Sequence, residues 1–384
     1  MNELVEHPDM KVLSLVSYTF LPAQTGGQKG IALFNKYFSQ KVELHCFTTK
    51  ANQNQLAGYN TIPLFSGTKL RYINLFYFFK IRKYIRKNNI THVVIEHPYF
   101  GWLGILLKTF CGIKLITHSH NIESLRWRDL GKWWWKILFR YEKIVHRKSD
   151  YNFFITDEDR GFAIEHFHLS TEKCITVTYG TELKEIPFAK EVDEAKKFVW
   201  EKHQIKDDEI IMLFNGAFNY DPNLKALDQL VNRINPFFLA NSNLKYKIII
   251  CGKYLPKEFS CEKTYPNIIF AGFVEDITLY LRSAKIFLNP VSEGGGIKTK
   301  LVEALAYNLS CISFATGALG IPKGITGDKF FVVRNDDFRV FAECVFQVCR
   351  SGRKLIPDSF FKTFYWGNII DNCVSFLKDS SKKK

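Results

Sequence analysis

Apolar residues recur along this chain in short runs, and each run is followed by a stretch in which they recur at helical spacing. Residues 11–17 form a first run, residues 31–38 show helical spacing, and residues 42–49 form a second run. Strand, helix and strand in this order predict a βαβ unit, whose crossover makes the two strands parallel. The alternation continues, with strands expected at 91–97, 113–118, 149–156, 209–215, 244–251, 268–272, 284–288 and 310–314, and with helices at 69–90, at 101–110, after Thr156, after Asp276 and after Gly296.

A polar segment separates these elements into two groups. Residues 184–206 are dense in lysine, glutamate and aspartate, which is typical of a connection and a solvated helix. A chain of 384 residues is long enough for two domains. We therefore expect domains at 1–188 and 189–358, followed by a segment at 359–384 with an amphipathic helix and a basic tail.

The chain is strongly basic, with 53 Lys and Arg against 38 Asp and Glu and a formal net charge of +15. An excess of this size implies an anionic partner, such as a nucleotide, a phospholipid surface or a nucleic acid. The sequence contains no nucleic-acid-binding module that we recognise, so we expect no nucleic-acid partner.

The nine cysteines are scattered, odd in number and without a CxxC pair. This pattern argues against a disulfide framework and against a zinc site, and it favours reduced thiols in a cytosol. Residues 1–9 are polar and acidic, unlike a signal peptide, and no apolar run approaches the roughly 20 residues of a membrane-spanning helix. We expect a cytoplasmic protein.

The strongest functional pattern is a glycine-rich stretch between a predicted strand and a predicted helix. Gly294, Gly295 and Gly296 would let the backbone approach a phosphate without a β-carbon in the way. The free amides and the positive end of the helix dipole would face that phosphate. Lys298 and Lys300 would add positive charge.

Glu303 lies about one helical turn beyond these lysines. Its carboxylate can accept hydrogen bonds from two adjacent hydroxyls, such as those of a ribose. Phosphate donors followed by a diol acceptor suit a nucleotide diphosphate. The plainer interpretation is a glycine-rich loop with surface lysines, and the spacing to Glu303 favours the nucleotide.

A second polar cluster follows the strand expected at 113–118. It contains His118, His120, Asn121 and Glu123. Two histidines and a carboxylate just past a strand end are a composition typical of active sites. Metal binding is a minority hypothesis, because the sequence shows no third ligand at a fixed spacing. The plainer alternative is a capped helix start with solvated polar groups.

The stretch from Gly294 to Tyr307, GGGIKTKLVEALAY, and the residues that follow it at 310–321 resemble the donor-binding signature of retaining GT-B glycosyltransferases of group 1, the family four type. The resemblance implies an α/β fold of two Rossmann-like domains facing a cleft, with a C-terminal helix crossing back to the first domain. Residues 1–188 would then be the acceptor domain, and residues 189–358 the donor domain. It also implies a nucleotide diphosphate sugar as donor substrate, no cofactor and no metal.

The resemblance assigns roles to individual residues. Glu303 matches a glutamate that holds the ribose, and Gly26 and Gly27 match a Gly-Gly loop near the diphosphate and the acceptor. His120 with Asn121 matches a position against the sugar and the acceptor. The catalytic residues expected in this way are His120 and Lys298, and the expected substrate-binding residues are Gly26, Gly27, Asn121, Gly216, Asn219, Glu293, Gly294, Gly295, Gly296, Thr299, Lys300 and Glu303.

The sequence departs from the family pattern at two places. The first of two motif glutamates would fall at Gly295 and is missing, and Glu293 lies two positions too early. The Arg and Lys that clamp the diphosphate in the family correspond to Ala217 and Pro222, so Lys298 is the expected source of positive charge. Both departures fit one subgroup, which has a small-residue loop followed by Lys-x-x-Glu-Ala.

The implied activity is transfer of a hexose-type sugar, with retention of its anomeric configuration, to a glycan or lipid-linked acceptor in bacterial-type surface polysaccharide or glycoconjugate synthesis. Front-face attack would need no carboxylate nucleophile, unlike catalysis by retaining glycosidases. The missing residues leave a second hypothesis, a non-catalytic nucleotide-sugar-binding or scaffold protein at a membrane surface. A sugar-nucleotide epimerase, which shares the fold, is a third.

Trp133, Trp134 and Trp135 are consecutive in a basic segment, so they cannot all face one side of a helix. Tryptophan with lysine and arginine suits a membrane interface, while burial in the core or in a cleft is an equal alternative. An anionic membrane surface, at the inner face of the plasma membrane, is therefore a further expected partner.

Overall fold

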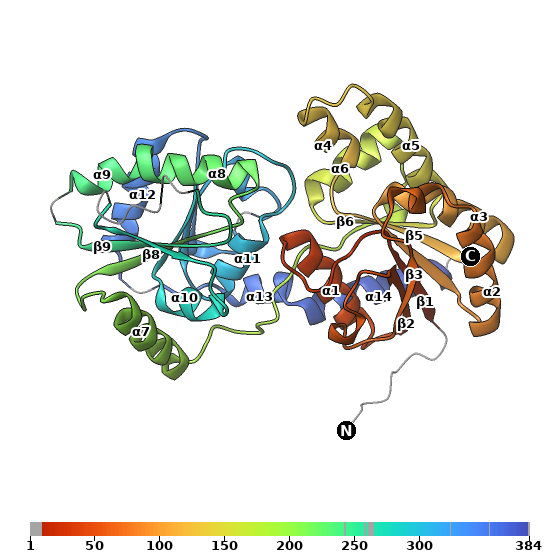
Figure 1. Cartoon of the computed structure of the whole chain (residues 1–384), viewed down its shortest axis with the longest axis horizontal. Coiled ribbons are helices and arrows are strands. Elements are labelled where there is room, and N and C mark those ends of the chain that lie inside the picture. The colour runs from red at the N-terminus through yellow and green to blue at the C-terminus, as the bar shows by residue number, and fades with distance from the viewer. Residues whose placement is uncertain are drawn as a thin grey trace. The chain divides into compact units, whose positions relative to one another are not determined.

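The computed structural model of the chain describes residues 10–241, 243–256, 259, 265–322, 324–352 and 354–382. It divides into a first unit, Met1–Gly180 with Trp366–Lys384, and a second unit, Thr181–Tyr365. Each unit is a parallel sheet with helices on both faces (Figure 1), which is the Rossmann-like architecture that we expected.

The first unit has a seven-stranded sheet in the order β3-β2-β1-β4-β5-β6-β7. Side chains of β1 alternate between the two faces, so Leu13 and Leu15 pack under α2 and α3 while Val16 packs under α1. Its elements are β1 (Lys11–Val16), α1 (Gly26–Phe38), β2 (Glu43–Thr49), β3 (Thr61–Phe65), α2 (Phe76–Asn88), β4 (His92–Glu96), α3 (Gly101–Cys111), β5 (Lys114–Ser119), α4 (Glu123–Asp129), α5 (Trp135–Lys148), β6 (Tyr151–Phe154), α6 (Asp157–Phe167), β7 (Cys174–Thr176) and α14 (Trp366–Lys382).

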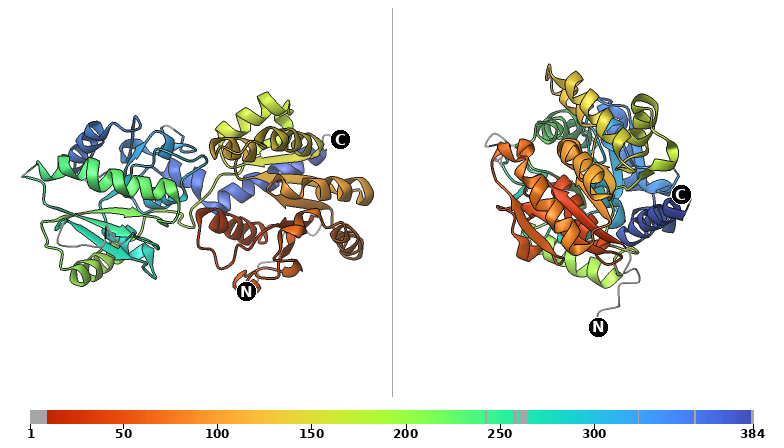
Figure 2. Two further views of the ribbon diagram at one scale, coloured as in Figure 1. Left: turned by 45° about the horizontal axis from the view of Figure 1, so that its top comes forward. Right: turned by 90° about the vertical axis from the view of Figure 1, so that its right-hand side faces the viewer.

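The second unit has a six-stranded sheet in the order β10-β9-β8-β11-β12-β13. Helices α8, α9 and α12 cover one face and α7 and α10 the other, as Figures 1 and 2 show. Its elements are α7 (Ala189–His203), β8 (Ile210–Asn215), α8 (Asp221–Asp228), a π-helical turn (Gln229–Ile234), α9 (Asn235–Leu239), β9 (Tyr246–Cys251), β10 (Ile268–Gly272), α10 (Ile277–Ser283), β11 (Ile286–Asn289), α11 (Thr299–Ala306), β12 (Ser310–Phe314), β13 (Phe330–Val333), α12 (Phe338–Arg350) and α13 (Asp358–Phe364).

One difference from the expected elements lies at the start of α1. We expected a turn at Gly26 and Gly27, but both residues are already helical, because Thr25 caps the helix. The Thr25 hydroxyl accepts the backbone N–H of Gln28, and the Gln28 side chain accepts the backbone N–H of Thr25. This reciprocal capping box starts the helix five residues earlier than its apolar spacing indicates.

Two other segments differ from the expected helices. The predicted helix at 69–90 is a short 3-10 helix, Lys69–Ile73, followed by α2. Trp133 and Trp134 precede α5, so only Trp135 is helical.

The chain returns to the first unit at its C-terminal helix. We expected this return from residue 359, whereas α13 belongs to the second unit and α14 begins in the first unit at Trp366. Helix α14 packs against α1, and Lys41, three residues after the end of α1, forms an ion pair of 2.8 Å with Asp371 of α14. Within the residues that the structure describes, no helix combines the length and the apolar character needed to cross a bilayer.

Candidate functional site

The glycine-rich loop connects the end of β11 to the start of α11. Gly294 and Gly296 have φ angles of +85° and +69°, in the left-handed region that favours glycine. A β-carbon on Gly294 would also lie 3.1 Å from the hydroxyl oxygen of Tyr220. A β-carbon on Gly295 would meet no atom within 4 Å. The loop therefore requires glycine at the first and third positions of the triplet, because of their left-handed backbone conformations, and not at the second.

The ammonium group of Lys298 is bound inside this loop. Its Nζ donates hydrogen bonds to the carbonyl oxygens of Gly294, Gly295 and Gly296 at 2.9, 3.0 and 2.9 Å. An ammonium has three N–H donors, so these contacts use all of them. Burial lowers the pKa of Lys298 to about 8. Lys298 therefore holds the loop carbonyls together and adds positive charge at its centre.

Lys300 extends from the first turn of α11 toward the end of β8. Its Nζ donates to the carbonyl oxygen of Asn215 and to Oδ1 of Asn223, both at 3.1 Å, and lies 4.6 Å from the ring centre of Phe214. Burial, with a smaller contribution from Lys298, lowers the pKa of Lys300 to about 7. These two contacts use two of the three N–H donors of Lys300.

Gly216 makes room for this arrangement at the end of β8. A β-carbon on Gly216 would lie 2.9 Å from the side-chain amide of Asn223, the same amide that accepts from Lys300. Asn223 also donates to the carbonyl oxygen of Ala217 at 3.1 Å. The expected site residues Gly216, Lys298 and Lys300 thus converge on the carboxyl ends of two neighbouring strands, where open α/β sheets bind ligands.

The remaining expected residues of the second unit occupy different positions around this loop. Glu293 is exposed and forms an ion pair with Lys225 of α8. Thr299 is the first residue of α11, and Glu303 lies half-buried one turn further along it. Asn219 is exposed in the turn after β8.

In the first unit, the carboxyl ends of β4 and β5 bring Glu96 together with two histidines. The two strands are adjacent, and Glu96 is directly opposite His118 in their register. Oε2 of Glu96 lies 2.7 Å from Nε2 of His120 and 3.0 Å from Nδ1 of His118. The contact with His120 is a hydrogen bond, whereas Nδ1 of His118 is not aligned for one.

This grouping supplies a third polar group that spacing along the chain could not show. The candidate ligand atoms of Glu96, His118 and His120 lie within 4.8 Å of one another. On a tetrahedral zinc with bonds of about 2.0–2.1 Å, two ligand atoms are about 3.3 Å apart. The 2.7 Å between Glu96 and His120 is shorter and matches a charge-assisted hydrogen bond.

The charges in this cluster are set by burial and by the contacts just described. Burial alone would raise the pKa of Glu96, but His118 and His120 lower it well below its usual range. Burial, with His97 and His118 nearby, lowers the pKa of His120 to about 4, although Glu96 opposes this shift. At neutral pH the cluster therefore contains an ionised Glu96 bonded to a neutral His120.

A second carboxylate–histidine pair lies beside the first. Nδ1 of His97 is 3.2 Å from Oε1 of Glu123, and the hydroxyl of Tyr99 donates to Oε2 of Glu123 at 2.7 Å. The rings of His97 and His120 are stacked with their centres 4.4 Å apart. His97 has a φ of +66°, a conformation that a non-glycine residue adopts at a cost and that is common at functional sites.

Tyr18 connects this pair to the start of α1. Its hydroxyl lies 3.3 Å from Nε2 of His97, and a β-carbon on Gly27 would be 3.9 Å from the same hydroxyl. Gly26 and Gly27 are the first residues of α1, and Asn121 directly follows His120. The expected residues of the first unit therefore gather at one end of its sheet. Glu96, His97 and Tyr18 are additions that the sequence pattern did not indicate.

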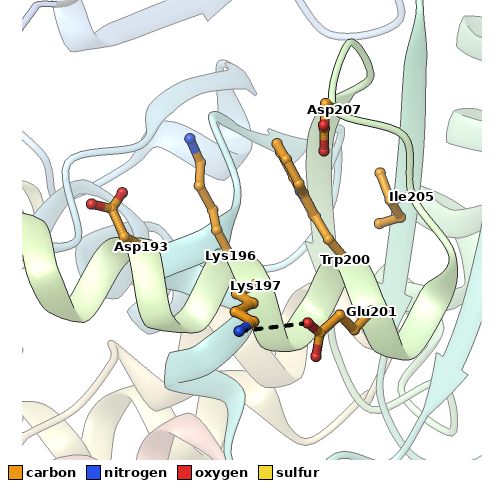
Figure 3. A pocket seen from close by; sticks show the side chains of 7 residues that line it. All are labelled: Asp193, Lys196, Lys197, Trp200, Glu201, Ile205 and Asp207. Carbon is orange, nitrogen blue, oxygen red and sulfur yellow. Dashed lines mark ion pairs between the residues drawn. The ribbon is translucent and has the colours of Figure 1, made fainter.

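A separate hollow in the second unit contains none of the expected residues. It lies along α7 and the loop after it, and Figure 3 shows that its walls carry mixed charges. Lys197 and Glu201, four residues apart on α7, form an ion pair at 3.9 Å in its wall. The lining residues are Asp193, Lys196, Lys197, Trp200, Glu201, Ile205 and Asp207. Five of them lie on α7, the solvated helix that the charge pattern predicted, and Ile205 and Asp207 lie in the loop after it, so we assign the hollow no role.

Two glycosyltransferase families match successive parts of the sequence. Residues 26–185 match the family described as Glycosyltransferase Family 4, and residues 209–351 match Glycosyl transferases group 1. A curated relative, the chitobiosyldiphosphodolichol beta-mannosyltransferase of Debaryomyces hansenii, is 23% identical over 229 residues, which cover 54% of this chain and 48% of that protein. The matched region thus spans about half the length of this relative.

Solved structures resemble the chain over almost its whole length. A glycosyltransferase from Rickettsia africae has a TM-score of 0.72 at 14% identity, and the match covers 98% of this chain and all of that one. The sucrose-phosphate synthase of Thermosynechococcus elongatus has a TM-score of 0.71 at 14% identity, covering 97% and 100%. The Anabaena protein HepE, solved in complex with UDP, has a TM-score of 0.70 at 11% identity, covering 96% and 100%. Identities this low establish the shared GT-B fold and no more.

Proposed function

Because the chain belongs to the group 1 glycosyltransferases, we propose that it transfers a hexose-type sugar from a nucleotide diphosphate sugar to a glycan or lipid-linked acceptor. The family pattern at 26–185 covers most of the first structural unit and ends five residues into the second, and the pattern at 209–351 lies within the second. Glycosyl transfer is the shared activity of the family, and the donor, the acceptor and the stereochemistry are the parts that we propose.

The observation that carries the donor proposal is the loop held by Lys298 between β11 and α11. The carbonyl oxygens of Gly294, Gly295 and Gly296 are bonded to Lys298, and the backbone amides of the same loop would donate to the anion. Lys300 has one N–H donor beyond its two contacts and would bind a phosphate oxygen. Glu303, one turn further along α11, would accept the ribose hydroxyls.

This arrangement supplies what departure of a nucleoside diphosphate requires. Negative charge develops on the leaving diphosphate, and fixed donors stabilise it without reorganising during the reaction. The positive charge would come from Lys298 and Lys300, so the proposed transfer requires neither a metal nor another cofactor. Retention of configuration is the part of the proposal that rests on the resemblance alone. The anomeric configuration of the product, read by NMR, tests it.

We propose an anionic membrane surface as the place where a lipid-linked acceptor is met. Residues 69–90 carry seven Lys and Arg and no acid, and residues 130–148 carry six with one acid, Glu142, which is buried. These segments and α3 also expose large apolar side chains, with Trp133 82% and Phe76 75% exposed. We call the cations of these segments, with the large apolar side chains that the segments and α3 expose, the basic-aromatic face; its apolar members are Leu70, Ile73, Leu75, Phe76, Phe79, Phe110, Leu130, Trp133, Ile137 and Ile144.

Charge and apolar exposure together favour a lipid surface over a soluble anion. Helices α2, α3 and α5 pack side by side in one layer of the first unit. Aromatic and aliphatic groups between lysines and arginines can enter the headgroup region while the cations bind anionic headgroups. We propose binding at the inner face of the plasma membrane.

Ligand-detected binding across a panel of UDP-, GDP- and ADP-sugars is the experiment that tests the donor proposal. One nucleotide is expected to bind the wild type, and both Glu303→Ala and Lys300→Ala are expected to weaken it. An acceptor screen with that donor then tests transfer. Binding without turnover over a broad acceptor panel would favour a non-catalytic nucleotide-sugar-binding scaffold, and release of a changed free sugar would favour an epimerase. If a folded protein binds no nucleotide sugar, the proposal is wrong.

A further inference from the structure

Glu96 is a fully buried carboxylate at the carboxyl end of β4, in a position where a hydrophobic side chain would cost the fold less. Taking an isolated carboxylate out of water costs several kcal/mol, and a partner must offset that cost. Its Oε2 has two neighbours, His118 and His120, while its Oε1 is buried without a hydrogen-bond partner among the described residues. The unbonded oxygen adds a desolvation cost of about 1–3 kcal/mol or more, so stability alone does not explain a carboxylate at this position.

The hydrogen bond from His120 to Glu96 determines which ring nitrogen carries the proton. An ionised carboxylate only accepts hydrogen bonds, so Nε2 of His120 must be the donor. The neutral ring then has its lone pair on Nδ1. Among the described residues, Nδ1 of His120 has no hydrogen-bond partner, and it is not one of the fully buried unpartnered atoms. It is therefore the nitrogen that retains access to a ligand.

The neighbours of His120 fix the plane of its ring as well as its proton. His97 stacks on one side at 4.4 Å between ring centres, and the ring of His118 lies at 4.5 Å. His118 in turn packs against Phe34 of α1 at 4.6 Å. The ring cannot rotate to exchange its two nitrogens without breaking the bond to Glu96 and displacing a stacked neighbour.

We propose that Glu96 is the positioning residue for His120: its carboxylate holds the proton on Nε2, so that Nδ1 accepts a hydrogen bond from a hydroxyl of the acceptor sugar. This inference rests on the proposed function, because it takes an acceptor sugar to be the ligand of the first unit. Glu96 itself does not touch the sugar. No bond to carbon forms or breaks at His120, which orients the hydroxyl that attacks the donor.

The test begins with the ring of His120 in the ligand-free protein. The protein is labelled with 15N in its histidine rings, and heteronuclear NMR gives the protonation of each ring nitrogen. The chain has ten histidines, and the His120→Gln variant identifies the signal of His120 among them. The wild type is expected to show His120 neutral and protonated on Nε2. Glu96→Gln, which removes the charge, is expected to give a mixture of both tautomers, and Glu96→Asp to stay close to the wild type.

His146 is an internal control in the same spectra. Its Nδ1 lies 2.8 Å from Oδ1 of Asn152, so its proton is expected on Nδ1, the opposite tautomer. His146 is buried between α5 and β6, and its signal should be the same in all three proteins. A change at His146 would show a global disturbance instead of a local one.

Steady-state kinetics then distinguish a positioning role of Glu96 from a purely structural role. With the donor and acceptor found in the screen, Glu96→Gln is expected to lower kcat on the order of 100-fold, with the donor KM within about twofold, and Glu96→Asp to recover most of the loss. Three results would each overturn the inference. The wild-type His120 could be protonated on Nδ1, Glu96→Gln could leave the protonation of the His120 ring unchanged, or this variant could change the ring protonation without changing kcat. If Glu96→Gln does not fold, the wild-type tautomer and the Glu96→Asp kinetics decide. The ring measurement needs no substrate, so its result stands even if the proposed function fails.

Discussion

The carbonyl oxygen of Gly216 lies directly against Gly252, so that a β-carbon added to Gly252 would be 1.7 Å from it. The two glycines follow β8 and β9, and the N–H of Gly252 donates to the carbonyl oxygen of Gly272 at 2.7 Å. Neither backbone can withdraw without breaking the ladder that positions Gly216 beside Asn223. The close approach therefore links packing in the sheet to the geometry of the proposed donor site.

Gly252→Ala is expected to destabilise the second unit by at least about 3 kcal/mol, because the clash is with backbone and not with a mobile side chain. Urea unfolding measures the loss of stability, and hydrogen exchange in β8 and β9 then locates it. Gly295→Ala is the matched control, since no atom lies within 4 Å of its added β-carbon, and its stability should stay within about 0.5 kcal/mol of wild type. Equal unfolding of both variants would contradict the close approach.

Lys300→Met is expected to weaken binding of the nucleotide sugar by about 10- to 100-fold, because it removes the proposed charge-assisted bond to the diphosphate and keeps the length of the side chain. Titration calorimetry with the donor from the panel gives the dissociation constant. Lys245→Met, which removes an exposed lysine paired with Asp208, controls for the change in net charge. Similar losses in both variants would mean that the effect is long-range and that Lys300 is not a ligand.

Donor affinity is expected to fall as the pH rises. Burial lowers the pKa of Lys300 to about 7 and that of Lys298 to about 8, whereas a bound diphosphate favours the charged ammonium. Binding therefore takes up protons, and one linked group with a pKa near 7 weakens binding by about tenfold from pH 6 to pH 8. The diphosphate of a nucleotide sugar has no ionisation in this range, so the protein is the source of the effect. Lys300→Met should flatten the profile, and a profile unchanged by this substitution would refute the assignment.

Glu303→Gln is expected to weaken the donor by about tenfold through loss of a charged acceptor for the ribose hydroxyls. The same substitution should have little effect on a donor whose ribose lacks one of those hydroxyls. The four dissociation constants form a cycle of protein and ligand changes. If the effects of the Glu303→Gln substitution and of the missing ribose hydroxyl are additive, the ribose does not contact Glu303.

Trp133→Ser combined with Phe76→Ser is expected to reduce binding to phosphatidylglycerol vesicles several-fold, as both side chains protrude from the basic-aromatic face. Co-sedimentation measures the bound fraction, and phosphatidylcholine vesicles are expected to bind weakly even the wild type. Phe188→Ser is the matched control, because Phe188 is 69% exposed but lies in the second unit. Equal losses for the control, or equal binding to both lipids, would exclude this face as the membrane contact.

The sequence was most informative where local physics decides the structure. Alternation of apolar runs and helical spacing predicted two parallel sheets, and caps at Thr156 and Asp276 start α6 and α10 as expected. The capping box of Thr25 and Gln28 also has a local sequence signature, a threonine followed three residues later by a glutamine, but apolar spacing begins only at residue 31 and does not include it.

Residues that meet through the sheet could not be found in this way. Glu96 and His120 are 24 positions apart, and they meet only because β4 and β5 are neighbours in register. The sequence likewise predicted a positive charge at Lys298, but it did not predict that the side chain points into the loop. The bonds to three loop carbonyls depend on the left-handed conformations of Gly294 and Gly296, which sequence spacing does not specify.

The order in which the chain is synthesised differs from the order in which its units are completed. Trp366 of α14 is buried with its ring near Tyr37 and Tyr179, so the helix is part of the first unit, yet the ribosome makes it after the whole second unit. Until α14 emerges, the side of α1 that packs against it has no cover, although the other side already packs on the sheet. The first unit is therefore incomplete during this time, and chaperones can bind the apolar surface that it exposes. Dividing the chain once, between Gly180 and Thr181, would also separate α14 from the rest of the first unit. A loss of activity in either half, expressed alone, could then result from incomplete folding.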